Sequence, residues 1–165
     1  MSNGLDAIDV RILQQLQIDC SISTSELAER VGLSQSPCWR RIQRLREEGY
    51  IKAQVAILDP ERMGFQMHIF AQLKMNNLAD NEREKFIREI AAIPEIVECY
   101  SVLGERDAMI KVIAPDIKWY QDFIFRKILK LPGVVDISST VALSEMKRTT
   151  ALPVRQGAVS YTHLR

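Results

Sequence analysis

Residues 21–51 read SISTSELAERVGLSQSPCWRRIQRLREEGYI and contain two helix-like segments separated by a glycine turn. The first segment opens with STSE at 23–26, a capping-box pattern in which two side chains satisfy free amide groups. Gly32 follows the last apolar residue, where helices commonly end on a residue that tolerates positive φ. Ser34 can then cap a second segment. This arrangement predicts two helices joined by a tight turn.

Apolar spacing extends the prediction to a third helix. Residues 6–17 carry four aliphatic side chains at helical spacing, and Asp6 can cap them. In the segment after Ser34, an inward face is formed by Cys38, Ile42 and Leu45 at i, i+4 and i+7. Three helices with a short glycine turn between the last two predict a helix-turn-helix.

Positive charge is concentrated on the third predicted helix. Residues 35–46 contain four arginines and no acidic residue. The helical wheel places Ser36, Arg40, Gln43 and Arg44 outward, and these side-chain types can contact base edges in a major groove. Arg41 and Arg46 lie at the flanks and suit phosphate contacts. Pro37 and Trp39 are expected to pack.

Charge balance offers a second interpretation of the same helix. Residues 1–60 hold seven Lys and Arg against eight Asp and Glu, and the whole chain has a net charge of +1. A strongly basic domain, the usual footprint of a DNA binder, is therefore absent. The arginines could instead form a solvated face. One helix makes few phosphate contacts, so DNA binding would favour a dimer.

The hydrophobic period changes after the third helix. Residues 50–59, YIKAQVAILD, are rich in β-formers and predict a strand, with a domain boundary near residue 62. Strands are then expected at 68–76, 96–104, 107–114 and 134–146, with helices at 81–93 and 116–131. The order βαββαβ predicts a ferredoxin-like domain over 63–153 and an α+β protein. Residues 154–165 show no periodicity and are expected to be a tail, native or not.

Several functional classes find no support in the residues. The histidines are His68 and His163, so no Ser-His-Asp or Cys-His set is expected, and the seven glycines form no phosphate loop. The three cysteines are far apart, which indicates a reducing compartment rather than disulfides or a metal. No signal peptide or membrane span is expected. We therefore expect a cytoplasmic protein that is no enzyme and holds no cofactor or metal.

The hairpin SVLGERDAMIKV at 101–112 is the informative stretch of the second domain. One interpretation is a polar turn without further role. The other is a small-ligand site, in which Asp107 and exposed turn amides hold the ammonium and carboxylate of a zwitterion. The strongly apolar strands also predict that two such sheets pack together in a dimer.

Two segments resemble the leucine-responsive regulatory protein/AsnC family of bacterial and archaeal transcription regulators: residues 5–64, LDAIDVRILQQLQIDCSISTSELAERVGLSQSPCWRRIQRLREEGYIKAQVAILDPERMG, and residues 103–147, LGERDAMIKVIAPDIKWYQDFIFRKILKLPGVVDISSTVALSEMK. The similarity runs from about Leu5 to Pro153. It implies a winged helix-turn-helix over 1–62, a C-terminal domain that binds amino-acid effectors, and homodimers that assemble into tetramers or octamers.

Carried over by position, the family implies two sets of site residues. The DNA contacts would come from Ser34, Gln35, Ser36, Arg40, Arg41 and Arg44, to which the outward face of the helix adds Gln43. The effector, bound between dimers, would contact Leu103, Gly104, Glu105, Arg106, Asp107, Ile117, Thr140, Val141 and Ala142. Arg106 departs from the family's acid-aromatic-acid turn. The segments PCWRRIQRL and MKRTTALP are similar to a branch that includes cysteine-responsive regulators, so cysteine is one candidate effector.

The resulting expectation is a regulator that binds operator DNA and whose activity or assembly responds to an amino acid. A nucleoid-architectural protein that bends DNA without a ligand is the alternative. A metabolic enzyme with an amino-acid-binding domain is a third class, which turnover assays would reveal.

Overall fold

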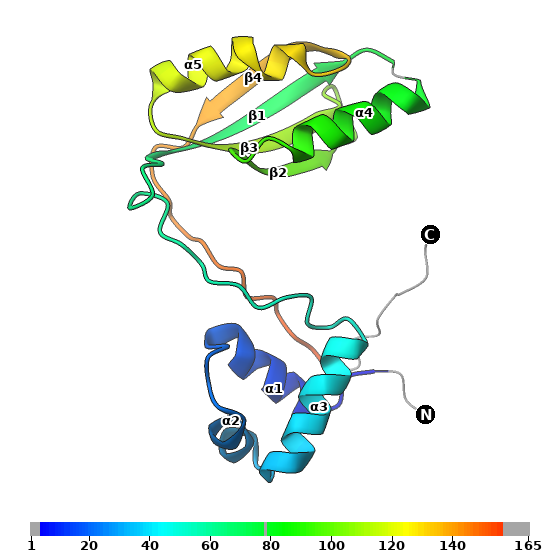
Figure 1. The fold of residues 1–165 in the computed structure, drawn as a ribbon, viewed down its shortest axis with the longest axis vertical. Coiled ribbons are helices and arrows are strands. Elements are labelled where there is room, and N and C mark those ends of the chain that lie inside the picture. Colours follow the sequence, from blue (N-terminus) through cyan, green and yellow to red (C-terminus); the bar gives the residue numbers. More distant parts are fainter. Residues whose placement is uncertain (1–3, 78, 157–165) are drawn as a thin grey trace. The chain divides into compact units, whose positions relative to one another are not determined.

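The computed structural model describes residues 4–77 and 79–156. The chain divides into two compact units, one comprising Ile57–Met146 and the other the segments before and after it (Figure 1). The first division lies between Ala56 and Ile57, close to the predicted boundary near residue 62. The second lies between Met146 and Lys147, so residues 147–153 group with the helical unit and not with the predicted second domain.

The helical unit consists of α1 (Ala7–Ile18), α2 (Thr24–Val31) and α3 (Gln35–Glu47). The Asp6 side chain accepts hydrogen bonds from the amides of Ile8 and Asp9 at the start of α1, and Asp9 reciprocates by accepting from the Asp6 amide. The Ser23 hydroxyl accepts from the Glu26 amide, while Gly32 ends α2 with a φ of 75°. Local sequence signals therefore fix the helix ends, as predicted.

Ser34 is the exception among the predicted caps. It occupies the N-cap position of α3 with an extended backbone, but its side chain makes no capping hydrogen bond. Ser34 is exposed, and the turn before it is closed by the Leu33 amide, which donates to the Ala28 carbonyl.

The core of the helical unit contains the predicted inward face of α3. Its fully or nearly buried residues are Leu5, Ile12, Leu13, Leu27, Ala28, Val31, Cys38, Ile42 and Leu45. Val154 packs against this cluster, and the backbone of Leu152 is bound at both polar groups by the Gln17 side chain. The returning C-terminal segment is thus part of the helical unit. The predicted tail beyond residue 156 lies outside the described residues.

Replacing Ser23 by alanine is expected to destabilise the helical unit by about 1 kcal/mol, because the Glu26 amide loses its capping acceptor. Urea denaturation followed by circular dichroism measures the change. Ser25→Ala, in the exposed first turn of the same helix, is the matched control, and an equal loss in that variant would contradict the capping role.

The strand predicted at residues 50–59 is not formed, and residues 51–59 have no regular secondary structure. Val55, Ile57 and Leu58 are exposed, with exposed fractions of 72%, 66% and 63%. A strand requires a partner for its amide and carbonyl groups, and the described part of this chain supplies none here. Residues 50–59, which would form the wing of the helix-turn-helix, therefore have a strand-like sequence but pair with no other strand in the described part of the chain.

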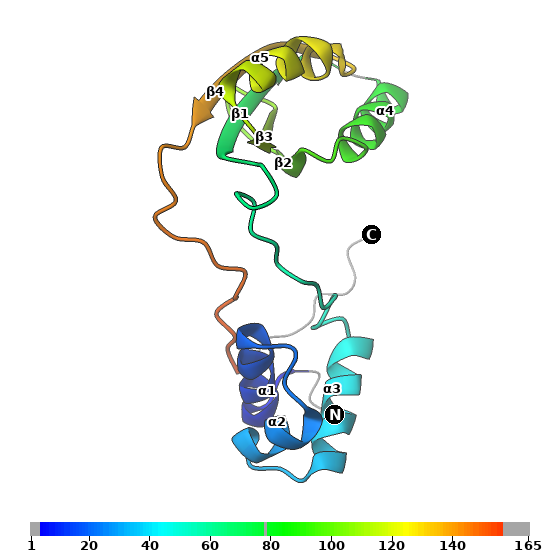
Figure 2. The ribbon, with the colours of Figure 1, turned by 60° about the vertical axis from the view of Figure 1, so that its left-hand side comes forward.

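The second unit contains one antiparallel sheet with the strand order β2-β3-β1-β4 (Figures 1 and 2). Its elements are β1 (Met67–Met75), α4 (Asp80–Ala91), β2 (Ile96–Ser101), β3 (Ala108–Ala114), α5 (Ile117–Arg126) and β4 (Val134–Val141). The predicted βαββαβ order is confirmed. α5 is shorter than predicted, because the chain passes into a 3₁₀ turn at Ile128–Lys130.

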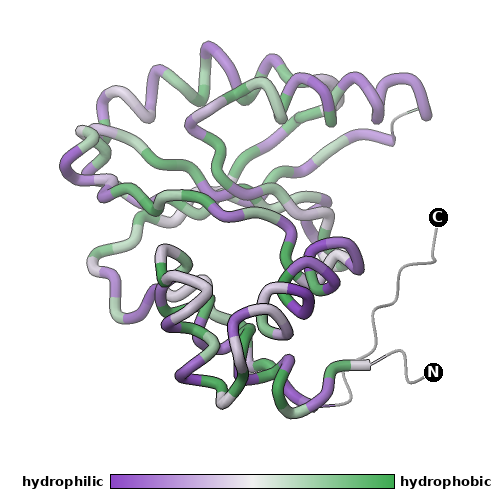
Figure 3. The backbone as a smooth tube through the Cα atoms, turned by 60° about the horizontal axis from the view of Figure 1, so that its bottom comes forward, coloured by the Kyte–Doolittle hydropathy of each residue, from purple (hydrophilic) through white to green (hydrophobic). Residues whose placement is uncertain are grey.

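The core of this unit lies between the sheet and the two helices. Alternate residues Ile69, Ala71 and Leu73 of β1 are fully buried on that face. The opposite face of the sheet remains open in the chain: Phe70, Tyr100 and Val135 are 42%, 53% and 50% exposed. Hydrophobic residues follow the strands, whereas the helices carry many hydrophilic ones (Figure 3). Because apolar residues lie on both faces of the sheet, we expect the face opposite the helices to be covered by another copy of the chain in an assembly.

Candidate DNA-binding and effector-binding sites

The outward face of α3 presents polar side chains that are free of the core. Ser34, Gln35, Ser36 and Arg40 are exposed, and Gln43 is half-buried. Ser36, Arg40 and Gln43 follow one another at i, i+4 and i+7, opposite the core face at Cys38 and Ile42. Within the described residues, the Arg40 guanidinium has no ion pair or hydrogen bond. This face can therefore contact DNA without breaking an existing interaction.

Arg41 and Arg44 are differently placed, because both pair with Asp9 of α1. Arg41 Nη1 lies 2.7 Å from Asp9 Oδ1 and 2.6 Å from Asp6 Oδ2. Arg44 Nη2 donates to the other oxygen of Asp9. The Asp9 side chain is 0% exposed, so this ion pair joins α1 to α3 inside the unit. The predicted outward placement of Arg44 is thus only half correct: it is 40% exposed, with its charge directed to Asp9.

The four arginines of α3 consequently separate into different environments. Arg46 donates to the Gln54 side chain over 3.0 Å, which leaves Arg40 as the arginine of this set that faces solvent unpaired in the described structure. The pairing of Asp9 with Arg41 and Arg44 was not predicted from the sequence. One feature of the sequence could have indicated that Asp9 is buried. It lies on the same helical face as the apolar residues Ile12 and Leu13, which follow it at i+3 and i+4.

Trp39 differs from its prediction as a packing residue. Its side chain is 53% exposed on the flank of α3. Pro37 is half-buried, in agreement with a packing role.

The turn predicted to hold the effector is anchored through Asp107. Asp107 Oδ2 accepts from the Met75 amide over 2.8 Å and lies 3.2 Å from Lys74 Nζ. The Met75 hydrogen bond and the Lys74 ammonium lower the pKa of Asp107, so it stays ionised to a lower pH than an ordinary aspartate of pKa 3.8. Asp107 Oδ1 has no hydrogen bond within the described residues. One carboxylate oxygen is thus fixed and the other is available.

The remaining turn residues are arranged around this carboxylate. Lys74 Nζ also donates to the Glu105 carbonyl over 3.1 Å, and Arg106 forms an ion pair with Asp136 of β4. The Arg106 guanidinium lowers the pKa of Asp136. Leu103 is fully exposed at the tip of the hairpin. Arg106, the departure from the family pattern, therefore has a structural partner in the chain.

The other predicted effector residues lie at the opposite end of the sheet. The Asp107 amide donates to the Leu73 carbonyl, whereas the Ala142 amide donates to the His68 carbonyl. Leu73 and His68 are separated by five residues of β1, or roughly 17 Å. Thr140 and Val141 pair with Phe70 and Ile69, also toward that end, and Ile117 begins α5 just after the end of β3. A single chain does not bring both groups to one small ligand.

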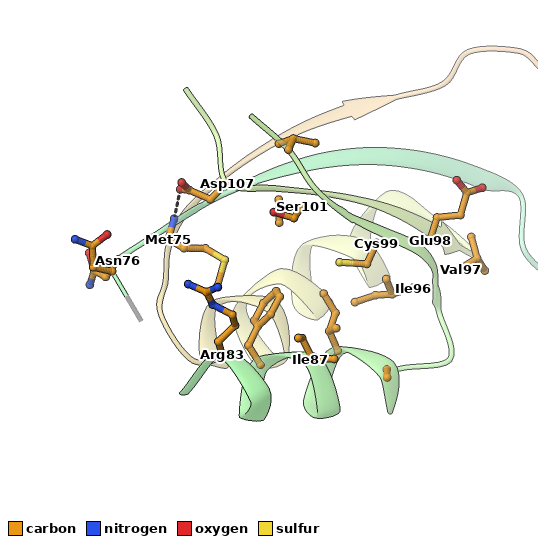
Figure 4. A pocket seen from close by; sticks show the side chains of 16 residues that line it. Met75, Asn76, Arg83, Ile87, Ile96, Val97, Glu98, Cys99, Ser101 and Asp107 are labelled. Atoms are coloured by element: carbon orange, nitrogen blue, oxygen red, sulfur yellow. Dashed lines mark hydrogen bonds between the residues drawn. The ribbon is translucent and has the colours of Figure 1, made fainter. Parts of the chain in front are cut away.

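A hollow of about 850 Å³ adjoins Asp107, between α4 and the strands β2 and β3 (Figure 4). Its apolar lining includes Phe86, Ile87, Ile96 and Val102, and its polar lining includes Arg83, Ser101 and Asp107. Arg83 extends from α4 toward the strand side near Met75. This hollow was not predicted from the sequence: its lining residues all lie within 75–108, but their convergence depends on how α4 packs against the strands.

Within residues 4–77 and 79–156 the structure shows neither a metal-ion cluster nor a helix suited to spanning a membrane. No group of His, Cys, Asp or Glu there has a geometry suited to a metal ion. In the same part of the chain, no helix is long and apolar enough to cross a membrane.

Comparison with known families matches both units. A family model described as "Winged helix-turn-helix DNA-binding" matches residues 5–52, and one described as "Lrp/AsnC ligand binding domain" matches residues 68–152. The "DNA-binding transcriptional activator DecR" of Escherichia coli strain K12 is 35% identical over 150 residues, covering 91% of this chain and 99% of that protein. The "Leucine-responsive regulatory protein" of the same strain is 36% identical, covering 92% of each chain.

Solved structures show the same architecture. An AsnC family transcriptional regulator from Agrobacterium tumefaciens superposes with a TM-score of 0.86 at 37% identity, covering 90% of this chain and 97% of that one. A transcriptional regulator from Neisseria meningitidis, solved as a complex with L-Met, gives a TM-score of 0.86 at 34% identity, covering 90% and 96%.

A helix-turn-helix unit joined to a ligand-binding sheet unit defines a DNA-binding transcription regulator. The chain belongs to the Lrp/AsnC family.

Proposed function

We propose that this regulator binds operator DNA through α3 as a homodimer and that an amino acid, bound at the Asp107 turn, alters its DNA occupancy. The observation that carries the proposal is the free face of α3, where Ser36, Arg40 and Gln43 lie in one row opposite the core. Arginine and glutamine can make paired hydrogen bonds to guanine and adenine in the major groove. These side chains therefore support recognition of a specific base sequence rather than DNA binding without sequence preference. The protein would act by binding, in the cytoplasm, rather than by catalysis.

The effector chemistry follows from Asp107. Its free oxygen would accept an α-ammonium group, and a charged hydrogen bond of this kind contributes about 1.5–3 kcal/mol. The relatives support the class of ligand, since one is named leucine-responsive and another was solved with L-Met. Cysteine joins leucine and methionine as a candidate, on the similarity of residues 37–45 and 146–153 to the cysteine-responsive branch.

The same geometry supports assembly of several copies of the chain. The hairpin turn and the group at Ile117 and Thr140–Ala142 would meet at one ligand only when two copies adjoin, because they lie at opposite ends of the sheet in each chain. The open sheet face and the exposed apolar residues at 55–58 offer surfaces for a first, dimer-forming contact. We therefore propose a dimer that assembles further into a tetramer or octamer, with the effector between dimers.

Mobility shift of the DNA upstream of its own coding sequence, with and without each amino acid, tests the proposal. Nanomolar binding altered by one amino acid is the expected result. Tight binding that no amino acid changes, with a shallow preference over competitor DNA, would instead support the nucleoid-architectural alternative. A ligand shifts occupancy only through different affinity for the free and DNA-bound states, typically a coupling of about 1–3 kcal/mol.

Replacing Phe70 by lysine, which would face the like charge of Lys111, is expected to weaken dimerisation roughly 100-fold, because an unpaired charge buried in an interface costs about 3 kcal/mol. Phe70 lies on the open sheet face, with Lys111 Nζ 5.8 Å from its ring centre. Light scattering across a dilution series measures the shift. Phe125→Lys is the control, because Phe125 is 61% exposed on α5. Equal dissociation of both variants would show that the sheet face is not the dimer interface.

A further inference from the structure

The ion pairs between α1 and α3 separate the arginines of the recognition helix by role. Asp9 is completely buried, and its two oxygens accept from Arg41 and Arg44, one each. A carboxylate enclosed in this way is stable only while paired, since a buried unpaired charge is strongly unfavourable. Asp9 therefore holds both guanidinium groups against α1.

Burial of the Arg44 side chain supports this separation. Its Nε is buried and has no hydrogen-bond partner within the described residues, so this edge of the guanidinium group is enclosed by protein. Arg41 is shared between Asp9 and Asp6, and its side chain is 29% exposed. For either arginine to reach a phosphate, its pairing with Asp9 would have to break or be stretched. Arg40 has no such partner within the described residues.

We infer that Asp9 is a positioning residue that withdraws Arg41 and Arg44 from DNA and fixes the rotation of α3, leaving recognition to Ser36, Arg40 and Gln43. The inference rests on the proposed function, in which α3 enters the groove. It differs from the expectation that Arg41 and Arg44 contact DNA together with Arg40. It also gives the charge cluster two roles, with two arginines holding the helix and one reading DNA.

Salt dependence of DNA binding tests the inference in the full-length protein. The variants are Arg41→Gln, Arg44→Gln and the comparison Arg40→Gln, titrated on a random-sequence duplex at several salt concentrations. Loss of one phosphate contact lowers the slope of log K against log salt by about 1. On random-sequence DNA, where Arg40 finds no matched base and would pair with a phosphate instead, Arg40→Gln is expected to show that loss with roughly tenfold weaker binding. Arg41→Gln and Arg44→Gln are expected to keep the wild-type slope and an affinity within about twofold.

A slope reduced by Arg41→Gln or Arg44→Gln as much as by Arg40→Gln would overturn the inference while leaving the proposed function intact. A wild-type slope in all three variants would instead remove α3 from the DNA interface, and with it the proposed mode of binding. The two failures are therefore distinguishable.

Asp9→Asn tests the inference in a second way. If Asp9 had only a structural role, its replacement would change neither the salt dependence nor the sequence preference of DNA binding. This variant keeps the side-chain shape but frees two guanidinium groups, so binding to random-sequence DNA is expected to become about tenfold tighter, with a slope steeper by about 1 to 2. The preference for upstream DNA over random DNA is expected to fall. Unchanged slope and preference in the folded variant would contradict the inference; if circular dichroism shows an unfolded variant, the three arginine variants decide.

Discussion

Replacing Asp107 by asparagine is expected to weaken effector binding by about 10- to 100-fold and to abolish the amino-acid response of DNA binding. Asparagine keeps an oxygen that can accept from the Met75 amide but removes the charge that would hold the ligand ammonium. A charged hydrogen bond contributes about 1.5–3 kcal/mol, which is the origin of the expected loss. Calorimetric titration with the responsive amino acid measures it, and mobility shift without ligand should remain at the wild-type value.

Lys74→Met is the matched control for Asp107→Asn. It removes the same ion pair from the other side while leaving the Asp107 carboxylate in place. If Lys74→Met reproduces the full loss of binding, the ion pair shapes the turn and Asp107 does not contact the ligand. Wild-type affinity in Asp107→Asn would place the ligand elsewhere, for example wholly within the hollow between α4 and β2.

Replacing Arg40 by alanine is expected to weaken operator binding by about 1–3 kcal/mol, or roughly 10- to 100-fold, and to relax the base preference at one position. The reason is that Arg40 is exposed on the outward face of α3 and has no competing partner in the described structure. Affinity measured on the operator and on single-base variants of it reports both effects.

Arg126→Ala removes the same charge from α5, where the side chain is 77% exposed. It controls for the general effect of lowering the net charge by one. An operator affinity that falls equally in Arg126→Ala and Arg40→Ala would mean that Arg40 acts only through long-range charge. Unchanged affinity in Arg40→Ala would remove it from the contact set.

The sequence predicted those features that depend on neighbouring residues. The Asp6 and Ser23 caps, the end of α2 at Gly32 and the inward face of α3 were all accessible, because their partners lie within a few positions along the chain. The βαββαβ order was accessible for the same reason, through its changes of hydrophobic period.

Features that depend on distant partners were not accessible. The strand pattern at 50–59 was recognised, yet a strand forms only when another strand pairs with it. Asp9 lies 32 residues from Arg41 in sequence, so nothing in the α3 pattern revealed that two of its arginines are neutralised. The separation of Asp107 from Thr140 across the sheet likewise required the strand register.

The attachment of Leu152 to Gln17 has a consequence for exchanging parts between relatives. The polypeptide leaves the helical unit after Ala56 and returns to it at Lys147, so the ligand-binding unit is topologically an insertion. A chimaera that transplants a new sensor onto this DNA reader therefore needs two junctions rather than one. A fragment cut after Ala56 would expose the Gln17 amide and the apolar surface that Val154 covers.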